Sequence, residues 1–307
     1  MITTVCMNPS FDKTASVSAL RAGGMNRLQG VRYDVGGKGI NVATVLKRLG
    51  VEAECVGCLG AENGAAFLAL LEKERLTFHH FSLSGNVRTN VKLWDAEAQA
   101  ITELNEEGPE MTAAQQTAFL ALLLEKTQGS KFIVFSGSVP AGCAPSTYQA
   151  YIRSLKGDRC VLDATGEALR LAISERPFLI KPNLPEMEEI MHTRLSSLDS
   201  VRKAALSLID QGARNVMVSL GKDGALLVTE NNTLYAKALP VEARSTVGAG
   251  DAMLGGMLMG LDQGEGIEAS FPYGIAAGAA SVMTEGTQLL QLSDFERLLP
   301  QVRVEKL

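Results

Sequence analysis

The sequence contains no apolar run that approaches the about 20 residues of a membrane-spanning helix. Its small-residue stretch Ile275–Met283 is far too short to cross a bilayer. The first residues also lack the basic start and apolar stretch of a secretory signal peptide. We therefore expect a cytoplasmic protein that has no membrane partner.

Basic residues are scarce relative to acidic ones. Lysine and arginine number 29 against 34 acidic residues, which gives a net charge of −5, and no basic run exceeds two residues. Proteins that bind nucleic acid carry a dense positive surface, so a nucleic-acid partner is not expected. A small anionic substrate remains compatible with this composition, because a few local cations are enough to hold it.

Signatures of metal-binding and hydrolytic sites are also missing. The chain has five cysteines and three histidines. Cys55 and Cys58 form a Cys-x-x-Cys pair inside an apparent strand, where positions three apart face opposite sides. None of the histidines, His79, His80 and His192, stands beside a recognisable nucleophile motif. The sequence thus disfavours a zinc or redox site and a Ser-His-Asp hydrolase.

What is present is the composition of an ordinary globular protein, with 46% apolar, 21% charged and 5% aromatic residues. Short apolar runs alternate with amphipathic segments. Strands are expected at Met1–Met7, Val51–Leu59, Lys131–Phe135, Arg159–Leu162, Phe178–Ile180 and Asn215–Leu220. Helices are expected at Gly39–Leu49, Ala65–Leu76, Ser146–Leu155, Pro185–Met191, Leu198–Gln211, Ala252–Leu261 and Ile275–Met283. This order predicts an α/β fold whose central, mostly parallel sheet is flanked by helices on both faces.

Two stretches, residues 20–34 and 86–104, depart from this order because they contain strand patterns with little helix between them. We expect them to form a small β-sheet lid over the carboxyl ends of the main strands, which is the edge where open α/β sheets bind ligands. The chain shows no internal repeat and no linker, so residues 1–307 are expected to form a single domain with this lid.

The segment from Ser245 to Asp251, Ser-Thr-Val-Gly-Ala-Gly-Asp, places a flexible glycine turn directly before a predicted helix. The free N–H groups at a helix start favour an anion. Asp251 would then stand beside that anion in the first helical turn. Phosphoryl transfer needs charge stabilisation and an oriented hydroxyl, and this arrangement offers both. The same pattern also fits a plain helix start with an acidic residue in its first turn.

A second glycine turn, Gly-Gly-Lys-Gly-Ile-Asn, runs from Gly36 to Asn41. It is not a Walker A motif because no Ser or Thr follows Lys38. Val42 breaks the Gly-x-Gly-x-x-Gly pattern, so a dinucleotide-dependent dehydrogenase fits poorly. Such a turn lets a polyhydroxy ligand approach the backbone, with Lys38 and Asn41 as donors. A flexible turn with a solvated lysine is the alternative interpretation.

Two further motifs lie between these turns. Asn183 and Glu186 are three residues apart at a predicted helix start, where an amide and a carboxylate can hold the water shell of Mg²⁺. The same spacing satisfies a capping box without any metal. Farther on, the segment Val218–Gly224 is a strand end followed by a glycine turn, which is a weak indication of a nucleotide site.

No one of these motifs decides the function, but their order along the chain does. Together the four motifs resemble those of the phosphofructokinase B branch of the ribokinase-like sugar kinases, and the resemblance extends from Asn8 to Gly286. It implies one ribokinase-like kinase domain with a β-lid. It also implies ATP and Mg²⁺ as cofactors, a sugar phosphate as the small-molecule partner, and a homodimer formed through the lid.

The resemblance further implies a role for each motif. Asp251 would be the base that takes the proton from the sugar hydroxyl, beside an anion hole formed by Gly248, Ala249 and Gly250. Contacts to the sugar phosphate are implied for Asp12, Gly37, Lys38, Asn41 and Arg88. Contacts to ATP are implied for Lys181, Asn183, Glu186, Ser219, Gly221, Gly224 and Gly278. Asn183 and Glu186 would also hold Mg²⁺ through water.

The choice of substrate depends on finer likenesses. A lysine at position 38 is similar to the 1-phosphofructokinases and the tagatose-6-phosphate kinases of this branch, and the stretch that begins at Thr89 is closer to the former. The resemblance therefore implies phosphorylation of fructose 1-phosphate to fructose 1,6-bisphosphate, with tagatose 6-phosphate as the alternative substrate. A non-catalytic sensor of sugar phosphate or nucleotide is disfavoured, because a pure binder needs no base at Asp251. The stretch Asp163-Ala-Thr-Gly departs from the pattern of the branch and is interpreted as structural.

Overall fold

The computed structural model describes all residues, 1–307, and its largest feature is a ten-stranded sheet. The strand order is β14-β13-β12-β11-β10-β9-β8-β1-β4-β5, and the strands from β11 to β5 run parallel. The strands are β1 Ile2–Cys6, β4 Ala53–Gly60, β5 Thr77–Leu83, β8 Phe132–Ser136, β9 Cys160–Asp163, β10 Leu179–Ile180, β11 Asn215–Ser219, β12 Ala225–Thr229, β13 Thr233–Ala236 and β14 Val304–Lys306. The predicted α/β class with a mostly parallel sheet is confirmed.

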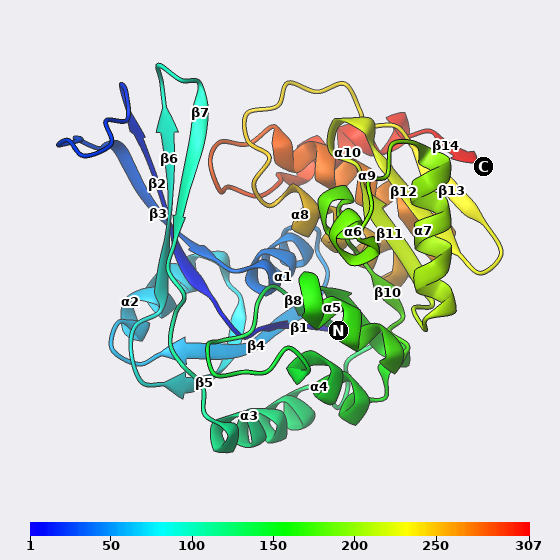
Figure 1. Cartoon of the computed structure of the whole chain (residues 1–307), viewed down its shortest axis with the longest axis horizontal. Helices are drawn as coiled ribbons and strands as arrows, with labels where there is room; N and C mark the ends of the chain where they lie inside the picture. The colour runs from blue at the N-terminus through cyan, green and yellow to red at the C-terminus, as the bar shows by residue number, and fades with distance from the viewer.

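Helices cover both faces of this sheet, and each face has its own hydrophobic core (Figure 1). One core packs against α3 Ala113–Lys126, α4 Thr147–Leu155, α5 Gly166–Ala172, α6 Leu184–Met191 and α7 Leu198–Asp210. The other packs against α1 Lys38–Arg48, α8 Ala249–Asp262, α9 Ile267–Val282 and α10 Leu292–Leu298. A further helix, α2 Gly64–Leu71, packs beside β4. Strands buried on two sides account for the continuous apolar runs of the sequence. None of these helices is both long and apolar enough to span a membrane.

A separate sheet of four strands, called here the small sheet, projects from one side of the molecule (Figure 1). Its strands are β2 Ser10–Val17, β3 Gln29–Gly36, β6 Arg88–Asp95 and β7 Ala100–Asn105, in the order β3-β2-β6-β7. Strands β2 and β6 are parallel, and the two outer pairs are antiparallel. The pairing puts Asp12 opposite both Asp34 and Asn90, so polar side chains of several strands share one face.

The predicted strand at 20–34 is partly wrong, because residues 20–28 form turns and irregular chain and only residues from Gln29 onward form β3. Sequence reasoning also missed β2, which pairs with both β3 and β6 at the centre of the small sheet. Its sequence is largely polar, and a strand with one polar face gives no apolar run. Helix α9 begins at Ile267, eight residues before the predicted start, because the helix continues across Pro272.

Helix α3 was not predicted at all. Its start is marked by a capping box, in which Thr112 and Gln115 each accept a hydrogen bond from the backbone N–H of the other. Phe119 and Leu123 are the residues it buries against the sheet. The capping pattern was therefore present in the sequence, and it is the signal that would have located this helix.

Candidate active site

The two glycine turns meet at the carboxyl edge of the main sheet. Gly248, with φ of 75°, lets the chain turn into α8, and Asp251 lies in the first turn of that helix with 6% of its surface exposed. Gly37, with φ of 110°, begins α1 in the same way. The Asn41 side-chain amide donates to Asp251 Oδ2 at 2.8 Å and so joins the two helix starts. The structure thus brings together the two motifs that the sequence singled out.

Behind this junction lies a cluster of charges centred on Asp163, at the end of β9. Asp163 Oδ1 is 3.2 Å from Lys38 Nζ and 3.3 Å from Lys181 Nζ. The Asp163 side chain has no exposed surface, and Ser136 Oγ donates to its other oxygen at 3.4 Å. Because the stretch that begins at Asp163 was interpreted as structural, Asp163 was not predicted as a residue of the site. Its position after a buried apolar strand of a parallel sheet was the available signal.

The two buried carboxylates of the site ionise differently. Burial and, next, the negative charge of Asp163 raise the pKa of Asp251 to about 6, against the opposing effects of Lys38, Asn41 and Lys181. Burial also disfavours the charged form of Asp163, but the charges of Lys181 and Lys38 outweigh it and hold its pKa below the ordinary value. The pKa of Lys38 is raised, because Asp163, Asp251 and Glu186 together outweigh the effect of burial. Asp251 is therefore the group that can exchange a proton near neutral pH.

This difference predicts the acid side of the pH profile. A base must be deprotonated to accept a proton, so kcat/KM is expected to fall as the pH drops through the Asp251 pKa of about 6. The measurement is kcat/KM for the sugar substrate across about pH 5 to 9. Asp163 is ionised throughout this window, so it adds no second acid limb. A profile that stays flat down to about pH 5 would contradict the assignment of Asp251 as the titrating group.

The predicted metal motif is present as a capping box at the start of α6. Asn183 Oδ1 accepts from the Glu186 N–H at 2.9 Å, and Glu186 Oε2 accepts from the Asn183 N–H at 2.9 Å. The second carboxylate oxygen, Glu186 Oε1, is not used by the cap and lies 3.9 Å from Lys38 Nζ. No group of three or more His, Cys, Asp or Glu side chains is placed to hold a metal ion directly. An ion bound beside Glu186 Oε1 would therefore keep most of its water shell.

The residues predicted to contact ATP come from several elements of the main sheet and its helices. The Lys181 ammonium lies 3.2 Å from where a Cβ on Gly250 would stand, so it points at the start of α8. Ser219 forms an isolated bridge with Asn183. Gly221 and Gly224 follow in the next turn, where a Cβ on Gly224 would lie 2.0 Å from the Ala236 carbonyl. Gly224 thus has a packing reason to be glycine that is independent of any ligand.

Gly278, the last of the predicted ATP contacts along the chain, lies on α9. A Cβ built there would lie 3.5 Å from the Ala249 carbonyl and from Met253, which is ordinary contact. The structure therefore places Gly278 beside the start of α8 but shows no close approach of protein atoms that demands a glycine.

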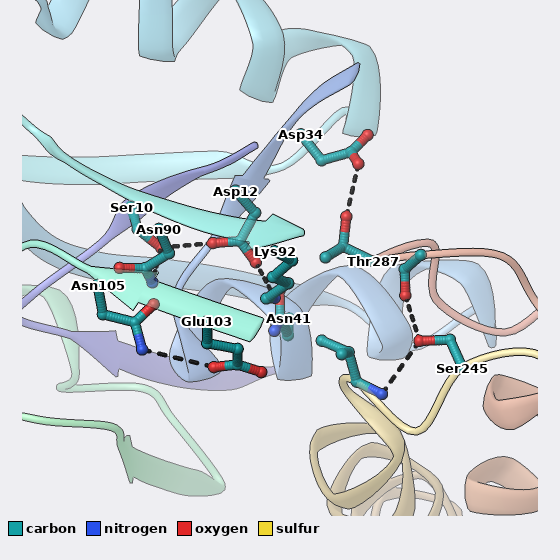
Figure 2. Close-up of polar contacts among 12 residues, drawn as sticks. Ser10, Asp12, Asp34, Asn41, Asn90, Lys92, Glu103, Asn105, Ser245 and Thr287 are labelled. Atoms are coloured by element: carbon teal, nitrogen blue, oxygen red, sulfur yellow. Dashed lines mark hydrogen bonds and ion pairs between the residues drawn. The ribbon is translucent and has the colours of Figure 1, made fainter. Parts of the chain in front are cut away.

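On the other side of the turn, the small sheet presents a polar face. Asp12 Oδ2 is 2.6 Å from Lys92 Nζ, and Asp12 Oδ1 accepts from Ser10 Oγ at 2.8 Å (Figure 2). The Asn90 amide donates to Ser10 Oγ at 3.1 Å. Lys92 and Asn90 were not singled out from the sequence, although they alternate with apolar residues on β6 and so had to share a face with Arg88.

Arg88 begins β6 and carries a charge that no carboxylate neutralises by a salt bridge. Its guanidinium donates to the carbonyls of Asn8 at 3.1 Å and Glu106 at 3.3 Å, and its Nε has no partner. Burial lowers the pKa of Arg88. The side-chain oxygens of Asn8 and Asn90 are also buried without a partner. Buried polar atoms are normally satisfied, so a partner that donates to these two oxygens and accepts from the Arg88 Nε would be stabilising here.

Lys38 and Arg88, both implied to contact the sugar phosphate, have different partners in the structure. The Lys38 ammonium lies against Asp163, whereas the Arg88 guanidinium lies against the Asn8 carbonyl. The loop after β8 separates them, because Gly137 lies beside Lys38 and Ser138 accepts from the Asn8 amide at 3.2 Å. The two cations therefore flank the site rather than converge at a single point.

The small sheet is tied to the body of the molecule near α8. Thr287 Oγ1 donates to Asp34 Oδ2 at 2.5 Å (Figure 2), and Arg32 donates to the Glu285 carbonyl at 3.4 Å. Ser245, at the start of the second glycine motif, donates to the Gly286 carbonyl at 2.5 Å. These contacts close one side of the site, and no sequence motif indicated them.

Comparison with known proteins identifies the family of the chain. Residues 6–293 match the profile described as pfkB family carbohydrate kinase. A 1-phosphofructokinase of Bacillus subtilis (strain 168) is 35% identical over 313 residues, covering 100% of both chains. Another, of Rhodobacter capsulatus, is 37% identical over 283 residues, covering 90% of each. The crystal structure of phosphofructokinase-2 from Escherichia coli in complex with potassium superposes with a TM-score of 0.91, at 29% identity and 98% coverage of both chains. The chain belongs to the pfkB family of carbohydrate kinases.

Proposed function

We propose that the protein transfers the γ-phosphoryl group of ATP to a hydroxyl of fructose 1-phosphate and so forms fructose 1,6-bisphosphate. Membership of a carbohydrate kinase family implies ATP as phosphoryl donor and a divalent metal ion. The relatives named as 1-phosphofructokinases support the sugar. The observation that carries the proposal is the buried Asp251, whose pKa of about 6 suits a base, at the start of α8 beside two lysines. The cytoplasm is its proposed location.

In this mechanism the chain orients both reactants. The oxygen of the sugar hydroxyl attacks the γ-phosphorus, its proton passes to Asp251, and the bond between the γ-phosphorus and the departing ADP oxygen breaks. The N–H groups at Gly248, Ala249 and Gly250 face the oxygens of the moving group, where the helix start favours negative charge. Asp12, with Asn41 and Gly37, would hold the sugar hydroxyls. Positioning and charge stabilisation supply most of the catalysis in such transfers.

We propose Mg²⁺ as the metal ion, held by Glu186 Oε1 and Asn183 through water. When bound, it would neutralise charge on the ATP phosphates. The fit rests on the one carboxylate oxygen of Glu186 that the capping box leaves unused, next to the Lys38 ammonium at 3.9 Å. Ser219, Gly221 and Gly224 would line the nucleotide side, and Gly278 the wall beside the base.

Replacing Glu186 by glutamine separates the metal role from the capping role. Glutamine retains the capping box but removes the charge, so the Mg²⁺ concentration for half-maximal rate is expected to rise about tenfold, with the sugar KM changed less. The measurement is a Mg²⁺ titration of the rate at saturating sugar, with thermal melting as the control for the fold. An unchanged titration in a variant that melts normally would leave Glu186 with capping alone.

An ADP-release assay tests the proposed substrate directly. Fructose 1-phosphate, fructose 6-phosphate, tagatose 6-phosphate and free fructose would be compared at equal concentrations with ATP. The proposal expects the highest kcat/KM for fructose 1-phosphate. The highest value for tagatose 6-phosphate would favour the alternative kinase, and binding of sugar phosphate without any ADP release would favour a non-catalytic sensor.

We also propose a homodimer that forms through the small sheet. The strands and turns of that sheet expose several large apolar side chains, among them Tyr33 at 47% and Leu104 at 59%, which the strand register places on the same face. Such a concentration on one substructure is typical of an interaction surface. A second copy with the same surface would cover it and would pair the unprotected edge strands.

Replacing Leu104 by glutamate is expected to weaken this dimer. A charge placed in an apolar interface loses its hydration without a partner, so the dissociation constant should rise at least about tenfold. Sedimentation equilibrium measures it, and Leu124, an exposed residue at 39% on α3, provides the matched control when changed to glutamate. A wild-type protein that sediments as a monomer at all concentrations would refute the dimer.

A further inference from the structure

The two lysines of the catalytic centre share one counter-ion. Lys38 begins α1 and Lys181 follows β10, so they are far apart in the sequence. Both ammonium groups nevertheless lie against the same atom, Asp163 Oδ1, at 3.2 and 3.3 Å. A single fully buried carboxylate oxygen therefore fixes two cations next to each other.

Asp163 is built to hold this arrangement and not to touch a ligand. Its side chain has no exposed surface, whereas that of Lys38 is 36% exposed. Ser136 Oγ approaches Asp163 Oδ2 at 3.4 Å, and the Asp163 backbone carbonyl accepts from the Gly137 N–H at 2.9 Å. The carboxylate thus lies behind the lysines, and any ligand meets the ammonium groups first.

The lysines face the place where phosphoryl transfer is proposed. The Lys181 ammonium lies 3.2 Å from the Cβ position of Gly250, in the turn before Asp251. The Lys38 ammonium is 3.9 Å from Glu186 Oε1, the oxygen that the capping box leaves free. Two lysines and one helix start direct hydrogen-bond donors to this point, and the carboxylates of Asp163, Asp251 and Glu186 balance the charge of the lysines. Donors gathered in this way suit a group that carries negative charge on several oxygens.

We infer that Asp163 is a positioning residue that holds Lys38 and Lys181 as a paired cation on the transferring phosphoryl group. Lys38 then acts in the transfer step and does not hold the substrate's own phosphate. This inference rests on the proposed kinase function. As the sugar oxygen bonds to the γ-phosphorus and the bond to the ADP oxygen breaks, the lysines donate hydrogen bonds to phosphoryl oxygens and keep their protons. The proton of the hydroxyl goes to Asp251.

Lys38→Met tests the role of Lys38 without emptying the buried site, because Lys181 still neutralises Asp163. At saturating substrates kcat is expected to fall about tenfold to a hundredfold. The dissociation constant of fructose 1-phosphate, measured by calorimetry without ATP, is expected to stay within about threefold of the wild type. Fructose 1-phosphate bound much more weakly, with kcat preserved, would overturn the inference and return Lys38 to the substrate phosphate.

Asp163→Asn tests the positioning role itself. It leaves both lysines in place but removes what fixes them, so kcat should fall about as far as in Lys38→Met, with both KM values less affected. Asp199→Asn, at an exposed carboxylate that pairs with Lys203 at 2.7 Å, is the matched control and should leave kcat unchanged. If Asp163→Asn folds and keeps its kcat, the inference is wrong. If it does not fold, the Lys38→Met result decides.

These outcomes remain distinguishable from failure of the proposed function. If the wild-type protein turns over no ketohexose phosphate, the proposed substrate fails. The lysine pair is then tested with the sugar that the protein does phosphorylate. Because the dissociation constant and kcat are measured separately, a wrong substrate and a wrong role for Lys38 give different results.

Discussion

Asp251→Asn is expected to lower kcat by about 10²–10⁴, the usual effect of removing a general base, while ATP continues to bind. Asparagine has nearly the same shape, and its side-chain oxygen still accepts the hydrogen bond from Asn41 that is 2.8 Å long in the wild type. What it lacks is a lone pair basic enough to take the proton of the sugar hydroxyl. The measurement is kcat by ADP release at saturating sugar, with the dissociation constant of ATP as the companion value.

Thermal melting checks the fold of this variant, because the direction in which its stability changes can be predicted. Burial raises the Asp251 pKa from 3.8 to about 6, so the folded state holds the proton more tightly than the unfolded chain does. Above pH 6 the ionised carboxylate therefore opposes folding, and a neutral asparagine removes that cost. At about pH 8 the variant should melt no lower than the wild type. Turnover close to that of the wild type would exclude Asp251 as the base.

The parts of the site that lie on continuous motifs were predictable. A glycine turn before a helix has a local physical meaning, because free N–H groups and a tight turn arise wherever the chain starts a helix in this way. The turns that lead to Asn41 and Asp251 are of this kind, and the structure joins them. The parallel sheet was equally predictable, since strands buried on both faces are apolar throughout.

The parts that depend on contacts between distant segments were not predictable. Asp163 is one acidic residue in a sequence rich in them, and its importance comes from Lys38 and Lys181, which the fold brings to it. Lys92 likewise pairs with Asp12 on the neighbouring strand. That strand, β2, was not predicted from the sequence. A strand such as β2 has no continuous apolar run, because the polar residues on one of its faces alternate with Phe11, Ala15 and Val17 on the other.

Arg88 is the residue we propose for the phosphate that the sugar already carries. Its guanidinium has no salt bridge, its Nε has no partner, and it donates to the Asn8 backbone carbonyl. Keeping a half-buried cation without a counter-charge is unfavourable, and a bound phosphate dianion would relieve it. Arginine can grip such a group with two parallel hydrogen bonds. The protein is acidic overall, with a net charge of −5, so general attraction cannot replace this contact.

Arg88→Ala is therefore expected to lower kcat/KM for fructose 1-phosphate by tenfold to over a hundredfold, which corresponds to the loss of about 1.5–3 kcal/mol for a charge-assisted contact. The KM for ATP should change little, because Arg88 lies on the small sheet, away from α8. The preference for fructose 1-phosphate over free fructose should shrink by a similar factor, since free fructose never made the contact. Arg88→Lys should recover only part of the loss, because an ammonium group cannot form the paired hydrogen bonds of a guanidinium. If Arg88→Ala kept the wild-type preference for the phosphorylated sugar, the phosphate would have to bind elsewhere.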